Sequence, residues 1–260
     1  MRLKDKVAIV TGSGRGIGRA IALRFAAEGA SVVVTARTAS ECDAVAKELA
    51  GKGGKGAAVA ADVSKAADCE RIVAVARDRV GSVDILVNNA GIYGPVKPIE
   101  EIAPEEWDQT QAINLRSAFL MTRLVLPEMY KRGSGVILNI SSVSAKAAFP
   151  WGSAYAASKA GMLALTRIVA AEAARKGVRV NAICPGPVFE TRMSQELGAQ
   201  ISARLGIDNE KQKESFIQQV LQGRPQTADE IAAAALYFVS DEASAITAQS
   251  LNVDGGTVFG

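Results

Sequence analysis

Short runs of apolar and β-branched residues alternate along the chain with longer segments in which apolar residues recur at helical spacing. The longer segments, such as GRAIALRFAAEGA and AADCERIVAVARDRVG, carry a glycine near their end, as helices often do. This alternation of strand and helix predicts an α/β fold. The expected strands cover residues 7–11, 31–36, 56–63, 84–90, 135–142, 178–185 and 250–255.

The expected strands are almost continuously apolar, which is typical of a parallel sheet covered by helices on both faces. We therefore predict a Rossmann-type doubly wound sheet. No repeat, low-complexity tract or charged linker interrupts the pattern, so residues 1–260 are expected to form a single domain. One region, from Pro185 to about Arg224, mixes polar and apolar residues without a strand. We expect residues 188–224 to form a substrate loop or lid.

Composition narrows the class of protein. The chain is 48% apolar and 22% charged, and its 30 basic and 27 acidic residues leave a formal charge of +3, which does not indicate nucleic-acid binding. No apolar run approaches a membrane span, and the N-terminus lacks the apolar region of a signal peptide. We expect a soluble cytoplasmic protein that binds neither nucleic acid nor membrane. Three widely spaced cysteines fit a reducing compartment.

The chain contains no histidine. This absence excludes Ser-His-Asp hydrolysis, Cys-His catalysis and histidine-ligated metals, and the cysteine spacing shows no zinc motif. We expect no metal site. Proton transfer near neutral pH then depends on carboxylates, Lys, Tyr, Ser and bound cofactors.

A glycine-rich turn, TGSGRGIG at residues 11–18, joins the first expected strand to its helix. Glycine lets the backbone approach a pyrophosphate closely, and the free N–H groups at the start of a helix attract anions. The spacing G-x-x-x-G-x-G differs from the common dinucleotide fingerprint, but its position between strand and helix favours nucleotide binding. The expected contacts come from Gly12, Ser13, Gly14, Arg15, Gly16, Ile17 and Gly18.

The end of the second strand distinguishes NAD from NADP. An acidic residue there would bind the ribose 2′-hydroxyl of NAD, whereas this chain reads VVVTAR, with Ala36 and Arg37. Arg15 lies inside the glycine turn, so two guanidinium groups are available for a 2′-phosphate. We expect NADP(H) to be preferred over NAD(H).

Five motifs follow one another along the chain: TGSGRGIG, NNAG at 88–91, AINL around Asn114, SSV at 141–143 and YAASK at 155–159. In their order and spacing they resemble the short-chain dehydrogenase/reductase family over essentially the whole chain. The resemblance implies NADP(H)-dependent interconversion of a ketone and a secondary alcohol. It implies one role for each catalytic residue: Tyr155 as general acid/base, Lys159 as ribose anchor that lowers the pKa of Tyr155, Ser142 as holder of the substrate oxygen, and Asn114 as a water-mediated relay link.

The resemblance also implies cofactor contacts beyond the glycine turn, from the adenine to the nicotinamide carboxamide. They would come from Asp62, Val63, Asn88, Asn89, Ala90, Gly91, Tyr155, Lys159, Pro185, Gly186, Val188 and Thr191. The family usually places a threonine five residues after the proline, whereas Thr191 stands six residues after Pro185. Either the loop bulges around Phe189, or another group makes that contact.

The residues themselves support this chemistry. Ketone reduction requires a proton at oxygen as well as the hydride that NADPH supplies. Tyr155 can donate that proton, and Lys159, one helical turn away on the same face, favours the phenolate. A lowering of the pKa by about two to three units would let the phenol work in both directions. Asn114 lies inside a helical pattern, an unfavourable place for asparagine unless its side chain has a task.

The expected substrate-lining residues are mostly apolar or aromatic: Tyr93, Phe149, Trp151, Phe189, Met193, Leu197 and Phe216. Such a lining suits a modest apolar or cyclic ketone or alcohol. The alternative is a 3-oxoacyl-carrier-protein reductase, in which Lys131 and Arg132 would contact the acidic carrier. The inserted IDNEKQKESF favours the first interpretation.

Two other classes remain open: a sugar-nucleotide epimerase or dehydratase, and a nucleotide-sensing protein without catalysis. The first typically has a differently spaced glycine turn and a longer C-terminal domain, and the intact Tyr, Lys, Ser and Asn set disfavours the second. The resemblance further implies a homotetramer, built from the helix that carries Tyr155 and from the segment LNVDGGTVFG.

Overall fold

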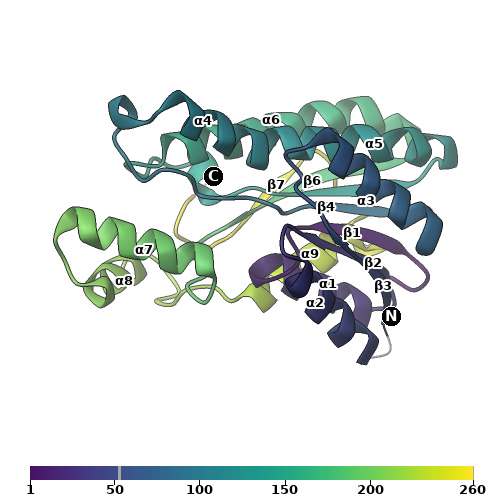
Figure 1. Ribbon diagram of the computed structural model, residues 1–260, viewed down its shortest axis with the longest axis horizontal. Coiled ribbons are helices and arrows are strands. Elements are labelled where there is room, and N and C mark those ends of the chain that lie inside the picture. Colours follow the sequence, from purple (N-terminus) through teal and green to yellow (C-terminus); the bar gives the residue numbers. More distant parts are fainter. Residues whose placement is uncertain (52–53, 260) are drawn as a thin grey trace.

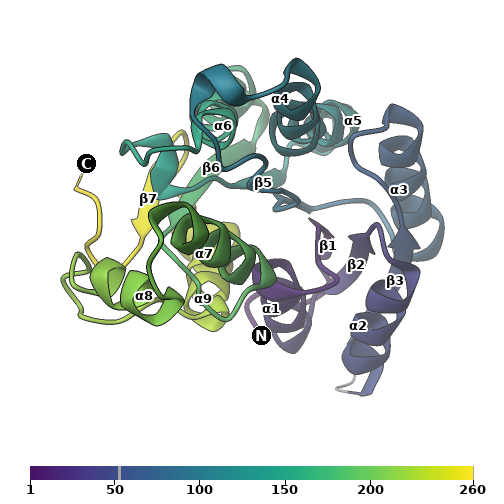
Figure 2. The same ribbon diagram turned by 60° about the vertical axis from the view of Figure 1, so that its left-hand side comes forward.

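The computed structural model describes residues 1–51 and 54–259, and its centre is a sheet of seven parallel strands (Figures 1 and 2). The spatial order β3-β2-β1-β4-β5-β6-β7 confirms the predicted Rossmann-type sheet. The strands are β1 (Val7–Thr11), β2 (Ser31–Ala36), β3 (Lys55–Ala60), β4 (Ile85–Asn88), β5 (Gly135–Ile140), β6 (Val178–Pro185) and β7 (Ser250–Val253).

Four strands, β3, β4, β5 and β7, end two or three residues earlier than predicted. Only β3 is followed directly by an apolar residue, Ala61, whereas β4, β5 and β7 are followed by Asn89, Ser141 and Asp254. The chain leaves the sheet there. After β3, β4 and β5, the residues that follow turn into the wall of a cavity.

Helices cover both faces of the sheet, as predicted (Figure 1). One face carries α1 (Gly16–Ala27), α2 (Ala39–Gly51) and α9 (Ala228–Val239), and the other carries α3 (Ala66–Arg79), α5 (Ser117–Arg132) and α6 (Ser153–Ala173). Successive strand residues face opposite cores: Ala8 and Val10 contact the first layer, and Ile9 the second. Complete burial of a side chain such as Ile9 contributes about 1.5–3 kcal/mol. The apolar strands therefore stabilise both helical layers.

A π-helical turn, Ala112–Arg116, interrupts the helix predicted around Asn114. It joins α4 (Pro104–Gln111) to α5 and places Asn114, which is fully buried, at its middle. Single π turns within α-helices often occur at functional sites, because they change the direction of nearby side chains.

The region predicted to be irregular is mostly helical. It forms α7 (Arg192–Leu205) and α8 (Asn209–Ile217), which stand off the sheet as a separate segment in Figures 1 and 2. The signal for α7 was an apolar stripe at four-residue spacing, Met193, Leu197, Ile201 and Leu205, and all four side chains line the cavity. Among residues 1–51 and 54–259, no helix is both long enough and apolar enough to cross a membrane.

Candidate active site

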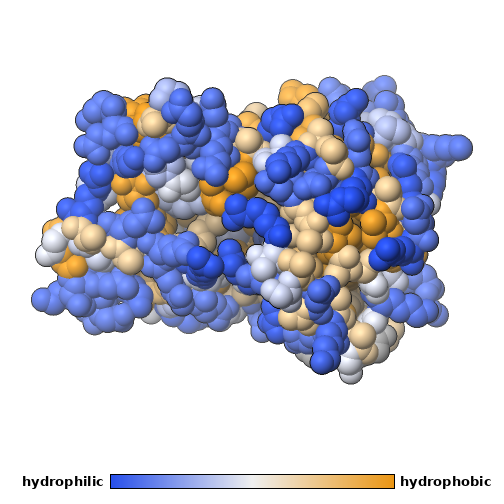
Figure 3. Space-filling view, viewed as in Figure 1, coloured by the Kyte–Doolittle hydropathy of each residue, from blue (hydrophilic) through white to orange (hydrophobic). Residues whose placement is uncertain are grey.

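A cavity of about 760 Å³ lies at the carboxyl ends of the strands, bounded on one side by α7 and α8. Figure 3 shows apolar side chains in the recess between the α7–α8 segment and the elements above it. The cavity includes the point between β1 and β4 where the chain reverses its direction of progress across the sheet. Ligands of open α/β sheets usually bind at such a switch point.

The glycine turn is fixed against the segment that follows β4. Asn89 Nδ2 donates to the carbonyls of Thr11 and Gly12, at 2.8 and 3.1 Å. The Thr11 hydroxyl oxygen accepts from the backbone N–H groups of Asn89 and Ala90, at 3.0 and 3.1 Å. A Cβ on Gly12 would lie 2.8 Å from Ala90 Cα, and a Cβ on Gly18 would lie 2.4 Å from the Gly12 carbonyl oxygen. These close approaches require glycine at both positions.

The helix after the turn begins at the cavity wall with uncapped N–H groups. Arg15 precedes the first residue of α1, has extended backbone and provides no side-chain cap. The positive end of the helix dipole and the first N–H groups of α1 are therefore available to an anion. Gly14, Gly16 and Ile17 also line the cavity here. Together these groups fit the pyrophosphate of a dinucleotide.

Ser13 does not reach the cavity wall, in contrast to our expectation. Its side chain is fully buried, its hydroxyl donates to the Val10 carbonyl at 2.6 Å, and its oxygen accepts from the Thr35 N–H at 2.9 Å. Ser13 therefore connects the glycine turn to β1 and β2. Its position in the motif did not reveal which way its side chain points.

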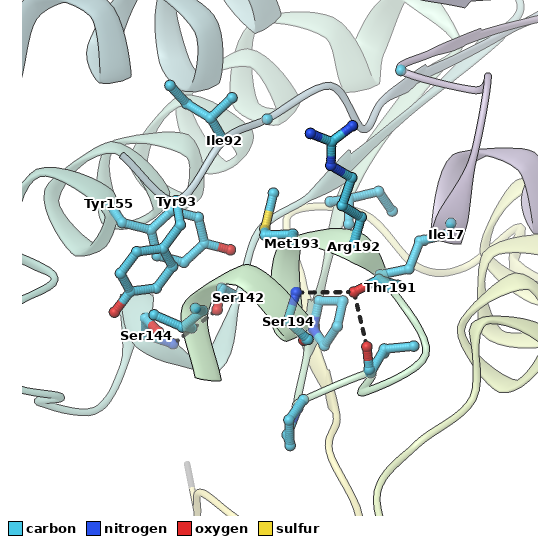
Figure 4. Close-up of a pocket in the computed structure, with 18 of the residues that line it drawn as sticks. Ile17, Ile92, Tyr93, Ser142, Ser144, Tyr155, Thr191, Arg192, Met193 and Ser194 are labelled. Carbon is cyan, nitrogen blue, oxygen red and sulfur yellow. Dashed lines mark hydrogen bonds between the residues drawn. The ribbon is translucent and has the colours of Figure 1, made fainter. Parts of the chain in front are cut away.

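Tyr155 and Lys159, near the start of α6, and Ser142, just after the end of β5, all line the cavity. Figure 4 shows Tyr155 and Ser142. Burial raises the pKa of Tyr155 to about 12, and a hydrogen bond with the Ser142 hydroxyl opposes this rise. Burial lowers the pKa of Lys159 to about 8. The Lys159 ammonium donates to the Ile140 carbonyl at 2.8 Å and lies 5.6 Å from the centre of the Tyr155 ring.

The direction of the Tyr155 pKa shift is opposite to the one we expected from Lys159. The phenol is only 8% exposed, so its charged form loses most of its hydration. Lys159 directs its ammonium to a backbone carbonyl rather than to the phenol oxygen. The groups of the protein alone therefore keep Tyr155 neutral at pH 7, which is the form that donates a proton.

The two serines after β5 have different tasks. Ser142 precedes a short 3₁₀ turn, Val143–Ala145, and its oxygen accepts from the Ser144 N–H at 3.1 Å. Its O–H remains able to donate to the Tyr155 phenol oxygen or to a substrate oxygen. Ser141 is buried and donates to the Lys159 carbonyl at 2.9 Å, which fixes α6 against β5. The structural role thus falls to Ser141.

Asn114 lies behind the cavity wall rather than in it. Its Oδ1 accepts from the Ile92 N–H at 2.8 Å, and its Nδ2 donates to the Ile92 carbonyl and to Ser158 Oγ, both at 2.9 Å. The side chain therefore fixes the segment after β4 against α6. The sequence predicts Asn114 as a relay link, and its contact with Ser158 was not among the predicted features. The sequence does show a small polar residue, Ser158, between Tyr155 and Lys159 on the predicted helix, and this could have indicated the contact.

Tyr93 stacks on Tyr155, with ring centres 4.7 Å apart and ring planes inclined by 23° (Figure 4). The segment that carries it is fixed because Ile92 is bound to Asn114. A Cβ on Gly152 would lie 2.4 Å from the Tyr93 hydroxyl, so the ring fills the space beside that glycine. Tyr93, which we expected only to line the substrate site, therefore also limits the movement of the Tyr155 ring.

Most of the other expected cofactor residues line the same cavity. Those lining the cavity are Gly12, Gly14, Arg15, Gly16, Ile17, Gly18, Arg37, Asp62, Val63, Asn89, Ala90, Gly91, Pro185, Gly186, Val188 and Thr191. The Thr191 hydroxyl donates to the Val188 carbonyl at 2.8 Å and accepts from the Ser194 N–H at 3.3 Å, at the start of α7. Asn88 lies inside the sheet, where it donates to Asn139 Oδ1 at 2.9 Å.

The opposite end of the cavity is aromatic and apolar. The Phe216 ring of α8 lies 6.5 Å from Phe149 and 6.2 Å from Phe189. Arg204, near the end of α7, lies over the Trp151 ring and pairs with Glu101 at 3.2 Å. The α7–α8 segment is thus attached to the rim on the far side of the cavity.

The basic residues considered for a carrier protein lie elsewhere. Arg132 ends α5 and pairs with Glu128 and Asp84, and it donates to the Val83 carbonyl. These partners place it at the amino ends of β4 and β5, whereas the cavity lies at the carboxyl ends of the strands. Arg132 therefore does not border the cavity mouth.

At one edge of the parallel sheet lie a glycine turn of the nucleotide-binding type and the side chains of Tyr155, Lys159 and Ser142. This combination defines an oxidoreductase of the Rossmann class. Residues 6–202 match the family model described as short chain dehydrogenase. The chain belongs to the short-chain dehydrogenase/reductase family, whose enzymes act on CH–OH and ketone groups.

Three similar proteins illustrate the range of this family. The D-beta-hydroxybutyrate dehydrogenase of Cupriavidus necator is 40% identical over 260 residues, covering 98% of this chain and 99% of the relative. A 7α-hydroxysteroid dehydrogenase, solved with NADH and 7-oxo glycochenodeoxycholic acid, is 36% identical with a TM-score of 0.91, covering 99% and 96%. An actinorhodin polyketide ketoreductase variant, solved with NADPH, is 37% identical with a TM-score of 0.93, covering 97% of each chain.

Proposed function

We propose that this protein is an NADP(H)-dependent oxidoreductase that interconverts a modest apolar or cyclic ketone and its secondary alcohol. The observation that carries the proposal is the convergence of the Tyr155 phenol, the Ser142 hydroxyl and the Lys159 ammonium on a cavity that joins a glycine turn to an aromatic end. Residues 1–260 form the catalytic domain, and the α7–α8 segment within 188–224 covers the substrate.

NADP(H), when bound, supplies or accepts the hydride. Tyr155 is neutral at pH 7 and gives its phenolic proton to the substrate oxygen, while Ser142 donates a second hydrogen bond to the same oxygen. With a pKa of about 8, Lys159 is positively charged at pH 7 and stabilises the phenolate that forms. In the oxidation direction Tyr155 must first lose its proton, so alcohol oxidation is expected to accelerate as the pH rises above neutrality.

The aromatic end of the cavity supports an uncharged substrate. Among the described residues that line this end are Phe149, Met193, Leu197 and Phe216, and none of these carries a charge. Arg192, which also lines the cavity, is paired with Glu196 at 2.6 Å. A substrate carboxylate, as in the hydroxybutyrate of the Cupriavidus necator relative, would have to displace Glu196 or lie among apolar groups, and the second is costly. A ring-bearing ketone, as in the steroid and polyketide relatives, fits this lining better.

A substrate panel tests this function. The purified protein is incubated with NADPH and cyclic ketones, linear ketones, acetoacetate or an acetoacetyl thioester, and loss of the reduced-nicotinamide absorbance is measured. We expect the highest kcat/KM with a cyclic ketone. Preference for the thioester would support the carrier-protein alternative, and absence of turnover with every compound would support the nucleotide sensor.

Arg15 and Arg37 support the preference for NADP(H). Both line the cavity beside the end of β2, at the corner where a ribose 2′-phosphate would bind. Replacing Arg37 by Asp is expected to weaken NADPH binding by about 10- to 100-fold, because it replaces an attractive charge by a repulsive one. NADH binding is expected to change by less than about three-fold, because its ribose carries no phosphate.

The matched control for this substitution is Lys47→Asp, which makes the same charge change on α2 at an exposed position outside the cavity. Dissociation constants for both cofactors are measured by titration calorimetry for the parent and both variants. Equal weakening of NADPH and NADH by Arg37→Asp, or equal affinity of the parent for both cofactors, would contradict the assignment.

We also propose a homotetramer in the cytoplasm. Exposed apolar side chains support the assembly, namely Phe119 of α5 and Ile168 of α6, which are 47% and 60% exposed, and Leu251 of β7. Light scattering of the purified protein tests this proposal, and the mass of a monomer would refute it.

A further inference from the structure

Glu41 lies at the corner of the cavity between the glycine turn and the end of β2. It is the third residue of α2 and belongs to the same wall as Arg15 and Arg37. A Cβ placed on Gly14 would lie 2.9 Å from Glu41 Cβ and 3.0 Å from Glu41 Oε2. The side chain therefore lies directly on the glycine turn. It was missed in the sequence because it stands five residues beyond the end of β2, outside every motif.

Glu41 is bound to one of the two arginines expected to receive the 2′-phosphate. Its Oε1 lies 2.8 Å from Arg15 Nη1, and the two side chains are 30% and 50% exposed. A pair exposed to this extent is well screened by water, so it can open when a ligand enters. A phosphate that binds Arg15 must then compete with the carboxylate already bound to it.

We propose that Glu41 is a specificity-determining residue that moderates the preference of this site for NADP(H). The inference rests on the proposed NADP(H)-dependent function and concerns the same site. The carboxylate repels a 2′-phosphate and occupies Arg15, both of which disfavour NADP(H). The same carboxylate is able to accept a hydrogen bond from the 2′-hydroxyl of NAD(H). One side chain thus acts on the two cofactors in opposite directions.

The test compares wild-type protein with Glu41→Gln, which removes the charge and keeps the size of the side chain. The matched control is Glu48→Gln, on the same helix, where Glu48 pairs with Arg19 outside the cavity wall. Dissociation constants for NADPH and for NADH are measured separately by titration calorimetry, so the readout does not depend on turnover.

We expect Glu41→Gln to tighten NADPH binding by about ten-fold and to leave NADH binding unchanged or weaker. The control is expected to change neither constant by more than about two-fold. An unchanged NADPH constant in Glu41→Gln would overturn the proposal. Weaker NADPH binding would also overturn it, because Glu41 would then be orienting Arg15 for the phosphate. Equal tightening of both cofactors would overturn it as well.

Failure of the proposed function gives a different result from failure of this inference. If wild-type protein binds NADPH no more tightly than NADH, while Glu41→Gln favours NADPH, the NADP(H) preference is wrong and the role of Glu41 stands. If wild-type protein prefers NADPH and Glu41→Gln keeps the same ratio of constants, the role of Glu41 is wrong and the preference stands.

Discussion

Replacing Tyr155 by phenylalanine is expected to lower kcat for ketone reduction by about 10²- to 10⁴-fold, the usual contribution of a general acid. The substitution removes the proton donor and leaves the buried ring, which stacks on Tyr93. NADPH affinity is expected to stay within about three-fold of the parent value, because the glycine turn and the arginines are untouched. The measurement is single-turnover oxidation of NADPH with the best ketone of the panel, beside calorimetric titration of NADPH.

Tyr93→Phe is the matched control, because it removes a hydroxyl from the other ring of the same stacked pair. Its kcat is expected to fall by less than about ten-fold, since Tyr93 limits movement of the Tyr155 ring and does not donate the proton in our scheme. If Tyr155→Phe kept more than about a tenth of the parent activity, another group would have to be the acid.

The arrangement of strands was predictable because it depends on a property of consecutive residues. Runs such as VAIVT and SVVVTA are apolar on both sides of a pleated strand, and only a sheet between two helical layers buries both sides. The helix α7 was predictable in principle from its four-residue apolar stripe. Polar residues lie between the stripe positions, as in any amphipathic helix, and our interpretation of this region as an irregular loop overlooked the period.

The direction in which side chains point was not predictable from motif spacing. Ser13 and Gly12 are neighbours in one motif, yet Ser13 is directed into the sheet. Asn114 carries the expected residue type in the expected place, but its amide is occupied by Ile92 and Ser158. These contacts join residues that are 22 to 44 positions apart, so only the folded chain decides them.

The pKa of Tyr155 illustrates the same limit for electrostatics. The spacing of Tyr155 and Lys159 correctly placed both groups at one site, and from it we expected the positive charge to dominate. Burial dominates instead, since it raises the pKa of the phenol and lowers the pKa of the ammonium. How deeply the Tyr155 phenol is buried depends on Tyr93 and on the sheet beneath it. Residues next to Tyr155 in the sequence do not determine this.

Replacing Lys159 by methionine is expected to lower kcat by about 100-fold and at the same time to stabilise the fold at pH 7. The kinetic loss follows because no positive charge remains to stabilise the Tyr155 phenolate. The gain in stability follows from the cost of keeping an ammonium ion in a site where Lys159 is only 3% exposed. A function that needs a buried charge is thus expected to reduce stability.

The pKa of Lys159 gives the size and the sign of this effect. Burial lowers it from 10.5 to about 8, and each unit corresponds to about 1.4 kcal/mol. Removing the charge at pH 7 therefore gains about 3 kcal/mol, from which about 1 kcal/mol is lost with the hydrogen bond to Ile140. A net gain of about 2 kcal/mol raises Tm by about 4–8 °C in a domain of this size.

The pH dependence separates this explanation from a simple packing effect. Between pH 8 and 10.5 the unfolded chain holds the Lys159 proton and the native chain does not, so the free energy of unfolding of the parent rises with pH in this window. The Tm difference between Lys159→Met and the parent should therefore be largest below pH 8 and should shrink toward pH 10.5. Lys47→Met, at an exposed site, should show no such trend. A Tm difference that is independent of pH, or a variant less stable than the parent at pH 7, would contradict the buried-charge argument.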